Sequence, residues 1–146
     1  MGPRSLVEVR LAGLALAFAL PDVRRVVRAV AVTPVPGAPG CLLGLIVVHG
    51  TPVPLYDLRR MLGLPTRALQ LDDRFLIAGE EGDQRAFVVD AVTGATEAQE
   101  AGAPASQAMA AAGVRGLARR GDGLLVIHDV RRFMAHESAQ VLHPHD

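Results

Sequence analysis

The chain has 146 residues, of which 50% are hydrophobic and only 3% aromatic, and its fifteen basic and fifteen acidic residues cancel to a net charge of zero. This composition argues against intrinsic disorder and predicts a folded interior of Leu, Val, Ile and Ala. It also argues against a nucleic-acid partner, because no excess positive charge is present to attract phosphates. The single cysteine, Cys41, cannot form an intramolecular disulfide, so we expect a reducing compartment and a cytoplasmic protein.

The first segments alternate large and small residues as β-strands do. Residues 6–11 and 14–20 predict a strand pair around an Ala-Gly turn. The apolar run 11–20 also has the length of a signal-peptide core, but its strict alternation and the preceding Glu8 favour a strand. No apolar run reaches the roughly 20 residues of a membrane span, so direct membrane insertion is not expected.

A third strand and a loop follow. The β-branched residues 26–32 predict a strand, and a short helical turn after Asp22 is the alternative, since the valines before residue 30 also fit helical spacing. Residues 33–40 contain three prolines, which lack an amide donor and have a fixed φ. We therefore expect a stiff loop at 33–40.

The centre of the chain predicts a hairpin followed by a short helix. Residues 42–49 and 52–56 are apolar and flank a Gly-Thr turn, and the two prolines of the second arm predict that it is partly an edge strand. Asp57 is placed to cap a helix over 58–62, which Gly63 would end.

The second half of the chain repeats this order of elements. It predicts a hairpin of 74–79 with 85–92, an irregular Ala-rich stretch at 98–113 with a helical turn at 106–112, a hairpin of 114–119 with 124–129, and a helix at 130–136 capped by Asp129. We expect residues 1–136 to form one domain and residues 137–146 to be a flexible C-terminal tail.

An internal repeat is the most informative pattern. Gly44 and Gly116 are 72 positions apart, as are Asp57 and Asp129, and the residues around each pair are similar. Upstream positions, such as Phe18 and Phe87, match with an offset of 69. Each half would hold about five short strands and one short helix, too little for a core of its own. The sequence therefore predicts a mainly β protein of two similar half-domains that share buried surface as a pair of small barrels.

Residues that could carry chemistry have simpler structural interpretations. Cys41 and His49 could act as nucleophile and base, but no third group orients them. Asp57 and Asp129 each directly precede a predicted helix, which favours capping over a pair of catalytic acids. Glycine-rich phosphate loops are absent from the sequence.

The remaining polar clusters also favour solvated surfaces. Irregular spacing makes a metal site improbable among the C-terminal ligand candidates His136, His143, His145 and Asp146. Arginine pairs at 24–25, 59–60, 119–120 and 131–132 are interpreted as solvated faces or as charges near helix C-termini. We expect no metal, no cofactor and no catalytic residue.

Several blocks of the sequence together resemble one family. They are Thr-Pro-Val-Pro-Gly-Ala-Pro at 33–39, Leu-Gly-Leu-Ile at 43–46, Gly-Thr-Pro-Val-Pro-Leu-Tyr-Asp-Leu-Arg at 50–59, Val-Val-Asp-Ala-Val at 88–92, Gly-Leu at 116–117 and Leu-Leu-Val-Ile-His-Asp at 124–129. Over roughly residues 6–134 the chain resembles the CheW family, adaptors that couple chemoreceptors to the CheA histidine kinase. The resemblance implies two five-stranded SH3-like barrels, in agreement with the repeat, and binding without catalysis.

The resemblance also implies two partners. Family members bind the regulatory domain of the kinase through barrel ends, and bind the helical tip of the receptor through a groove between the barrels. On that basis Val23, Arg25, His49 and Gly50 are candidate receptor-side residues, and Gly44 lies near a candidate kinase-side edge.

Two positions depart from the family pattern. His49 stands where the family usually has Arg, and Arg25 stands where it often has an acidic residue. Imidazole lacks the fork of guanidinium and titrates near neutrality, so a receptor with altered charges is expected. The sequence therefore predicts a divergent CheW-like adaptor. The alternatives are a general β-barrel interaction module in a two-component pathway without a receptor array, and a small hydrolase that uses Cys41 or His49.

Overall fold

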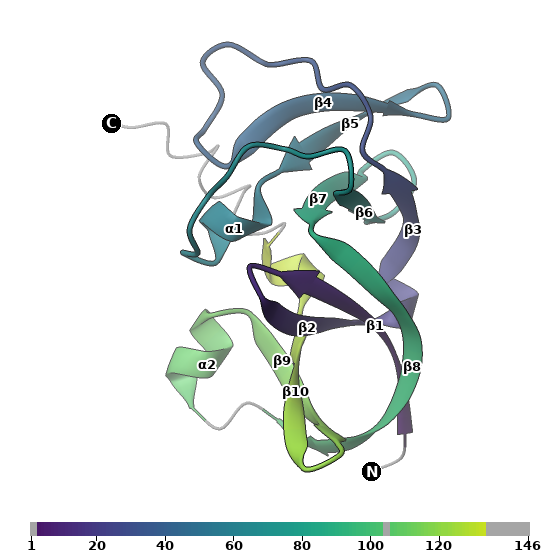
Figure 1. Cartoon of the computed structure of the whole chain (residues 1–146), viewed down its shortest axis with the longest axis vertical. Helices are drawn as coiled ribbons and strands as arrows, with labels where there is room; N and C mark the ends of the chain where they lie inside the picture. The colour runs from purple at the N-terminus through teal and green to yellow at the C-terminus, as the bar shows by residue number, and fades with distance from the viewer. Residues whose placement is uncertain (1–2, 104–105, 134–146) are drawn as a thin grey trace.

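The computed structural model describes residues 3–103 and 106–133. Within these ranges the chain forms ten strands, two labelled α-helices, one 3-10 helix and a further helical turn at residues 130–133. The elements form two stacked β-structures (Figure 1). In chain order they are β1 (Pro3–Leu11), β2 (Leu14–Ala19), η1 (Leu20–Asp22), β3 (Val23–Arg28), β4 (Leu42–Val48), β5 (Thr51–Tyr56), α1 (Leu58–Met61), β6 (Arg74–Ala78), β7 (Arg85–Val89), β8 (Ala91–Gly102), α2 (Gln107–Ala111), β9 (Val114–Arg120) and β10 (Gly123–His128).

Two five-stranded sheets make up the molecule. The first is a closed barrel in the order β1-β2-β10-β9-β8, at the bottom of Figure 1. The second has the order β3-β6-β7-β5-β4, at the top. An isolated bridge between Thr33 and Leu45, with two N–H···O bonds of 2.8 Å, joins its outer strands. We call the two structures the first and second barrel, and they confirm the mainly β fold predicted from the sequence.

The two barrels exchange strands between the two halves of the sequence. The first barrel combines β1 and β2 with β8, β9 and β10, whereas the second combines β3, β4 and β5 with β6 and β7. The simple expectation that each half of the chain makes its own barrel is therefore wrong. The reason is that the hairpin of each repeat completes the barrel of the other repeat, so neither half contains a whole core.

The repeat extends to the register of the strands. The parallel pair Leu55↔Ala86 of the second barrel corresponds to Ile127↔Ala17 in the first, which are the offsets of 72 and 69. Register shifts recur at equivalent places: Leu43 of β4 is skipped in the pairing with β5, and Arg115 of β9 is skipped in the pairing with β10. These shared irregularities show that the repeat is structural as well as sequential.

Three apolar clusters fill the molecule. The largest lies between the barrels and draws on both, with Val9 and Phe18 from the first barrel and Leu76 and Phe87 from the second. A second cluster, including Ile46, fills the interior of the second barrel. The third is inside the first barrel and contains only five buried residues, which are Leu6, Ala17, Ala118, Leu125 and Ile127. The barrels thus share one core, as the size of each half predicts.

One buried polar residue belongs to the shared core. His128 is 7% exposed, and its ring stacks on Phe133 with centroids 5.9 Å apart and lies 6.2 Å from Phe18. Its Nδ1 has no hydrogen-bond partner among the described residues. Burial lowers the pKa of His128 below the usual 6.5, against a smaller opposing effect of a hydrogen bond with the backbone of Val126. His128 is therefore held neutral in the folded chain.

Most predicted local elements are confirmed. Ala12 and Gly13 have positive φ values of 53° and 81°, the type I′ pattern of the β1–β2 turn. Asp57 caps α1 by accepting a 3.1 Å hydrogen bond from Arg59 N, and Asp129 accepts one of 3.0 Å from Arg131 N. Pairing of β5 with β7 is limited to its last two residues, so its proline-containing part is an edge, as expected.

Three strand predictions need correction. The predicted strand 85–92 is divided at Asp90, since β7 ends at Val89 and β8 begins at Ala91. The third strand begins at Val23, directly after the 3-10 turn, and ends at Arg28 instead of covering 26–32. The stretch from residue 98, expected to be irregular, continues β8 as far as Gly102. Pairing with β1 and β9 imposes this strand on residues of low intrinsic β-propensity. The predicted tail at 137–146 and the end of the last helix lie outside the described residues.

No helix in the described ranges is long and apolar enough to cross a membrane.

Candidate partner-binding site

The β4–β5 turn presents two of the predicted site residues. His49 and Gly50 occupy its two central positions with φ values of 49° and 80°, a type I′ turn. Both are exposed, and the hairpin extends beyond the body of the second barrel (Figure 1). The sequence Val-His-Gly-Thr therefore places an imidazole at the tip of the molecule.

Arg25 of β3 contacts the same imidazole. Its Nη1 lies 2.9 Å from Nδ1 and 2.9 Å from Nε2 of His49. Because guanidinium can only donate, the imidazole ring is the acceptor in this contact. The two side chains, 24 residues apart in the sequence, form one polar unit at this end of the second barrel, which we call the Arg25–His49 pair.

The other two predicted site residues lie elsewhere. Val23 is half-buried against the core between the barrels. Gly44 is buried in β4, five residues before His49 and thus about 17 Å along the strand. A Cβ at Gly44 would lie 2.3 Å from the carbonyl oxygen of Thr33, and its φ is +150°. The structure therefore gives Gly44 a backbone role in closing the second barrel.

A small cavity lies between the barrels, close to Val23. It measures about 160 Å³ and is lined by Pro21, Asp22, Arg24, Gly79, Glu80, Val130 and Arg131. Arg24, one residue before Arg25, faces this cavity. Asp22 at its wall forms a 2.8 Å ion pair with Arg115. The cavity and the Arg25–His49 pair are thus two separate features of the β3 region.

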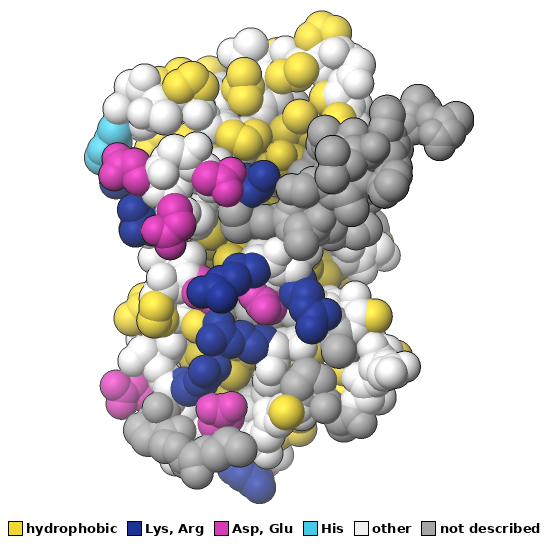
Figure 2. Space-filling model, turned by 180° about the vertical axis from the view of Figure 1, so that it is seen from behind, with side chains coloured by type: hydrophobic (Ala, Val, Ile, Leu, Met, Phe, Trp, Pro, Cys, Tyr) yellow, Lys and Arg dark blue, Asp and Glu magenta, His cyan; other side chains and the backbone are white. Residues whose placement is uncertain are grey.

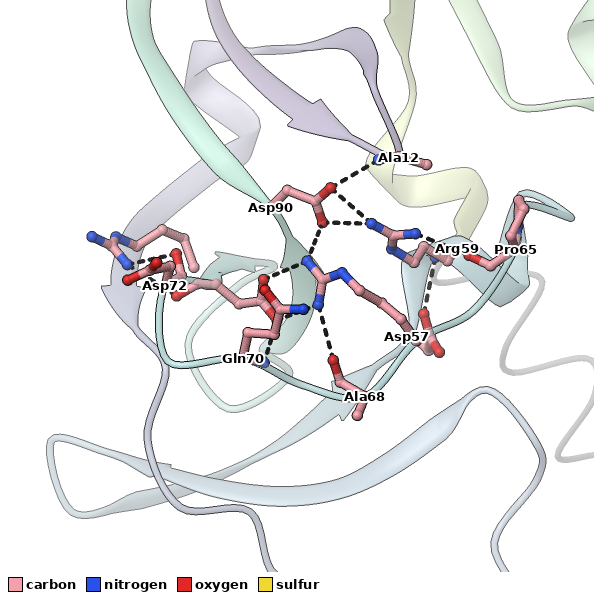
Figure 3. A network of polar contacts seen from close by, with 11 residues as sticks. Ala12, Asp57, Arg59, Pro65, Ala68, Gln70, Asp72 and Asp90 are labelled. Atoms are coloured by element: carbon pink, nitrogen blue, oxygen red, sulfur yellow. Dashed lines mark hydrogen bonds and ion pairs between the residues drawn. The ribbon is translucent and has the colours of Figure 1, made fainter.

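The relative position of the barrels is fixed by an ionic network around Asp90, between β7 and β8 (Figure 3). Arg59 of α1 approaches both oxygens of Asp90, at 3.0 and 2.8 Å. The backbone N–H of Ala12, in the β1–β2 turn, donates to the same carboxylate at 2.9 Å. Arg67 donates to Asp90 at 2.8 Å and to Asp73 at 2.7 Å. Asp90 therefore connects one turn of the first barrel to two segments of the second.

The far end of this network is buried. Burial alone would raise the pKa of Asp73, but hydrogen bonds from Arg67 and from Gln70 N, together with the positive charge of Arg67, hold it below the usual 3.8. The hydrogen bond to Asp73 in turn raises the pKa of Arg67. Both shifts favour the charged forms of Asp73 and Arg67. We call Arg59, Arg67, Asp73 and Asp90 the Asp90 network.

The sequence analysis did not identify the Asp90 network. It assigned Arg59 to a solvated face or a helix terminus, but the Arg59 side chain is 13% exposed and paired with Asp90. A signal was present in the repeat: the position equivalent to Asp90, 69 residues earlier, is Pro21. An acid that breaks a repeat between two strands indicates a function specific to one half.

The proposed pair of Cys41 and His49 is not assembled. The two residues lie at opposite ends of β4, eight positions apart, which is roughly 25 Å of extended chain. Cys41 is buried, whereas His49 is at an exposed turn. A nucleophile and a base must be within hydrogen-bond reach, so the hydrolase that used these two residues together is ruled out.

The surface differs between the two ends of the molecule. From behind, hydrophobic side chains cover much of the upper end, and basic side chains form a patch over the middle and lower part with acidic ones at its margins (Figure 2). In the described part of the second barrel and its connections the exposed large apolar residues are Val26, Val30, Val35, Val47, Leu69 and Leu71. An exposed apolar surface with a charged border is typical of protein–protein contacts.

These observations define a class, a double β-barrel interaction module. The CheW-like domain family matches residues 5–138, and the chain belongs to this family. Among solved structures it is similar to the scaffolding protein TtCheW from Thermoanaerobacter tengcongensis, with a TM-score of 0.73 and 27% identity over 86% of this chain and 88% of that one. No curated protein matched the chain. Family and fold place the chain among the scaffold and adaptor proteins of chemotaxis signalling.

Proposed function

We propose that this protein is a non-catalytic, cytoplasmic adaptor that couples a chemoreceptor to a CheA-type histidine kinase, with the receptor bound beside the Arg25–His49 pair. Membership of the CheW-like family supports the adaptor role. The observation that carries the choice of surface is the 2.9 Å contact between Arg25 and His49.

The contact changes how the two departures from the family pattern are understood. Taken separately, the replacement of an acid by Arg25 and of an arginine by His49 are two independent losses of charged groups that the family usually has. Since the two side chains touch, they are better explained as one linked change. The family pattern often has an acid at the strand position and usually an arginine at the turn position, whereas here the cation is on β3 and the acceptor is on the turn. The receptor is then expected to place its acidic group opposite β3.

The kinase surface is expected at the opposite end of β4. The Pro-rich loop at 33–40 and the β4–β5 hairpin keep the family blocks, and the Thr33–Leu45 bridge ties this loop to β4. Gly44 allows the close approach of Thr33 on which the bridge depends. We therefore expect kinase binding to tolerate the changes at Arg25 and His49.

Titration calorimetry of the full chain against a standard chemoreceptor tip and a CheA regulatory domain tests the proposal. The double variant R25E/H49R restores the family charges and should bind the receptor tip at least tenfold more tightly than the wild type. R25E alone and H49R alone should not, because each leaves an incomplete pair. R28E, a charge reversal at the other end of β3, is the matched control. Kinase affinity should stay within about twofold in all four.

Two outcomes would contradict the proposal. If R28E strengthens receptor binding as much as R25E/H49R, the pair is not the receptor contact. If the chain binds the kinase domain but neither wild type nor double variant binds any receptor tip, the general interaction module of a divergent two-component pathway is the correct function.

A further inference from the structure

Four positions inside the first barrel differ in chemistry from their equivalents in the second. The offsets of 69 and 72 pair Glu8 with Ile77, Thr96 with Val27, Ala118 with Ile46 and Arg120 with Val48. In the second barrel these four equivalents belong to the aliphatic interior or pack against it. In the first barrel the same positions hold an acid, a hydroxyl, a small side chain and a base.

This exchange leaves a cavity. It measures about 400 Å³, and its lining includes Glu8, Gly94, Glu97, Arg119, Arg120 and Gly121. Its lining residues come from β1, β8 and the β9–β10 hairpin, and the turn of this hairpin is at the end of the first barrel that is remote from the second (Figure 1).

Glycines keep this mouth open. Gly94 is equivalent to Arg25, and Gly121 is equivalent to His49, so the two side chains that meet over the second barrel have no counterpart here. No atom lies within 4 Å of a Cβ built on either glycine. The mouth is thus open because side chains are missing from its rim, and the space they would take is free.

The interior end of the cavity carries a buried charge. The Glu8 side chain is only 5% exposed, and Arg120 Nη1 lies 2.6 Å from its Oε2. The contact is an ion pair without hydrogen-bond alignment, since Oε2 has no hydrogen-bond partner among the described residues. A buried carboxylate oxygen with no aligned donor is costly, and a ligand that brings N–H groups would satisfy it.

The charges of the lining define the ligand. Two acids, Glu8 and Glu97, balance two bases, Arg119 and Arg120, so the cavity favours a molecule without net charge. The buried acid lacks an aligned donor, whereas the exposed guanidinium groups of Arg119 and of Arg120, which is also paired with Glu8, can bind an anionic group. We propose that the mouth of the first barrel binds a small zwitterion of the amino-acid class, with its ammonium group at Glu8 and its carboxylate at Arg119 and Arg120.

The test is a titration of the ¹⁵N-labelled full chain followed by NMR. L-alanine and L-glutamine are the zwitterionic probes, and propionate and ethylammonium are the analogues of L-alanine that each keep one charge. The amide resonances of Gly94 and Gly121 should shift with at least one zwitterion, and each one-charge analogue should bind at least tenfold more weakly than L-alanine. The amide of Gly50, at the tip of the other barrel, should not move.

Two variants make the result decisive. E8Q keeps the shape of the side chain and should weaken zwitterion binding at least tenfold. E8I/R120V copies the aliphatic lining of the second barrel, so it is expected to fold and to lose binding altogether. E81Q, at the exposed β6–β7 turn, should bind like the wild type. Ethylammonium binding as tightly as L-alanine, unchanged affinity in E8Q, or no shift with either amino acid would overturn the proposal.

Discussion

The two barrels have one backbone plan and two different interiors. The strand order is the same in both, and the two register shifts of the second barrel recur in the first. The first barrel is hydrogen-bonded all round, whereas the second is joined between the segment after β3 and β4 by the Thr33–Leu45 bridge. Conversely, the second barrel is filled by aliphatic and aromatic side chains, whereas the first has a small core and a polar mouth. Backbone closure and side-chain filling are therefore independent devices for holding a small barrel together.

The difference in closure has a local cause. In the first barrel β8 continues to Gly102, so it pairs with both β1 and β9. In the second, the equivalent strand β3 ends at Arg28 and pairs with β6 only. The pairing of β3 with β6 thus ends early, and only Ala29 N extends it, with a 3.2 Å bond to Asp73 O.

The largest expected effect separates the two closures. Gly44→Ala should cost about 3 kcal/mol of unfolding free energy, because its Cβ would meet the Thr33 carbonyl at 2.3 Å and its φ of +150° is strained for any side chain. The equivalent change, Gly116→Ala, should cost about 1 kcal/mol or less, since the nearest atom is at 3.2 Å. Urea unfolding of both variants checks this, and equal losses would contradict the difference in closure.

The next effect concerns the connection between the barrels. Asp90→Ala should cost about 2 kcal/mol, because it leaves Arg59, Arg67 and the Ala12 N–H without their shared acceptor in a partly buried site. Asp83→Asn is the control: Asp83 is 70% exposed and 3.3 Å from Arg85, so its loss should stay within about 0.5 kcal/mol. Thermal unfolding measures both changes, and similar values would mean that the network does not stabilise the arrangement of the barrels.

A third effect is expected from His128, which stands at the position equivalent to Tyr56 in the repeat. The unfolded chain protonates His128 near its usual pKa of 6.5, whereas burial lowers the pKa of the folded one. Below about pH 6.5 the unfolded state therefore binds a proton that the folded state does not, and stability falls by up to about 1.4 kcal/mol per pH unit. Well above that pH His128 binds no proton in either state, so the unfolding free energy no longer depends on its titration.

The variant His128→Tyr introduces the residue that the second barrel has at the equivalent position. It should remove the loss of unfolding free energy at low pH that comes from His128. Unfolding free energies from pH 5 to 8 for the wild type and the variant provide the measurement. If the unfolding free energies of wild type and variant change with pH in parallel, burial of His128 is not a cause of the loss of stability at low pH.

The smallest expected effect tests the symmetry of the helix caps. Asp57→Ala and Asp129→Ala should each cost about 1 kcal/mol, because each removes the acceptor of a backbone N–H at a helix start. Asp57→Asn keeps an acceptor oxygen and should lose less. Thermal midpoints that do not change in either alanine variant would argue against capping.

Local sequence signals predicted what depends on local physics. Turn glycines, the prolines of the 33–40 loop and the caps Asp57 and Asp129 determine conformation within a few residues, and the repeat added the pairing of equivalent strands. Local sequence patterns gave the wrong prediction where pairing with strands distant in the sequence determines the conformation. In β8, alanine, glycine and glutamate residues form a strand only because β1 and β9 flank it.

The site was predictable to the same degree. Sequence resemblance selected Arg25 and His49 separately, but their contact across 24 residues needed the barrel. The Asp90 network and the charged mouth at Glu8 remained hidden, because single charged residues carry no signal of burial. Only comparison of each residue with its repeat equivalent, Pro21 for Asp90 and Ile77 for Glu8, would have indicated them.

The exchange of strands has a consequence for how the chain is made. During synthesis the β1–β2 hairpin leaves the ribosome before the other described strands, yet its neighbours β8 and β10 follow only after residue 90. The second barrel, whose strands all lie between Val23 and Val89, is complete earlier and can serve as the template on which the first barrel then closes. A chain cut in the 62–73 connection should accordingly yield two fragments that are each unfolded but that fold together when mixed, because every barrel needs strands from both.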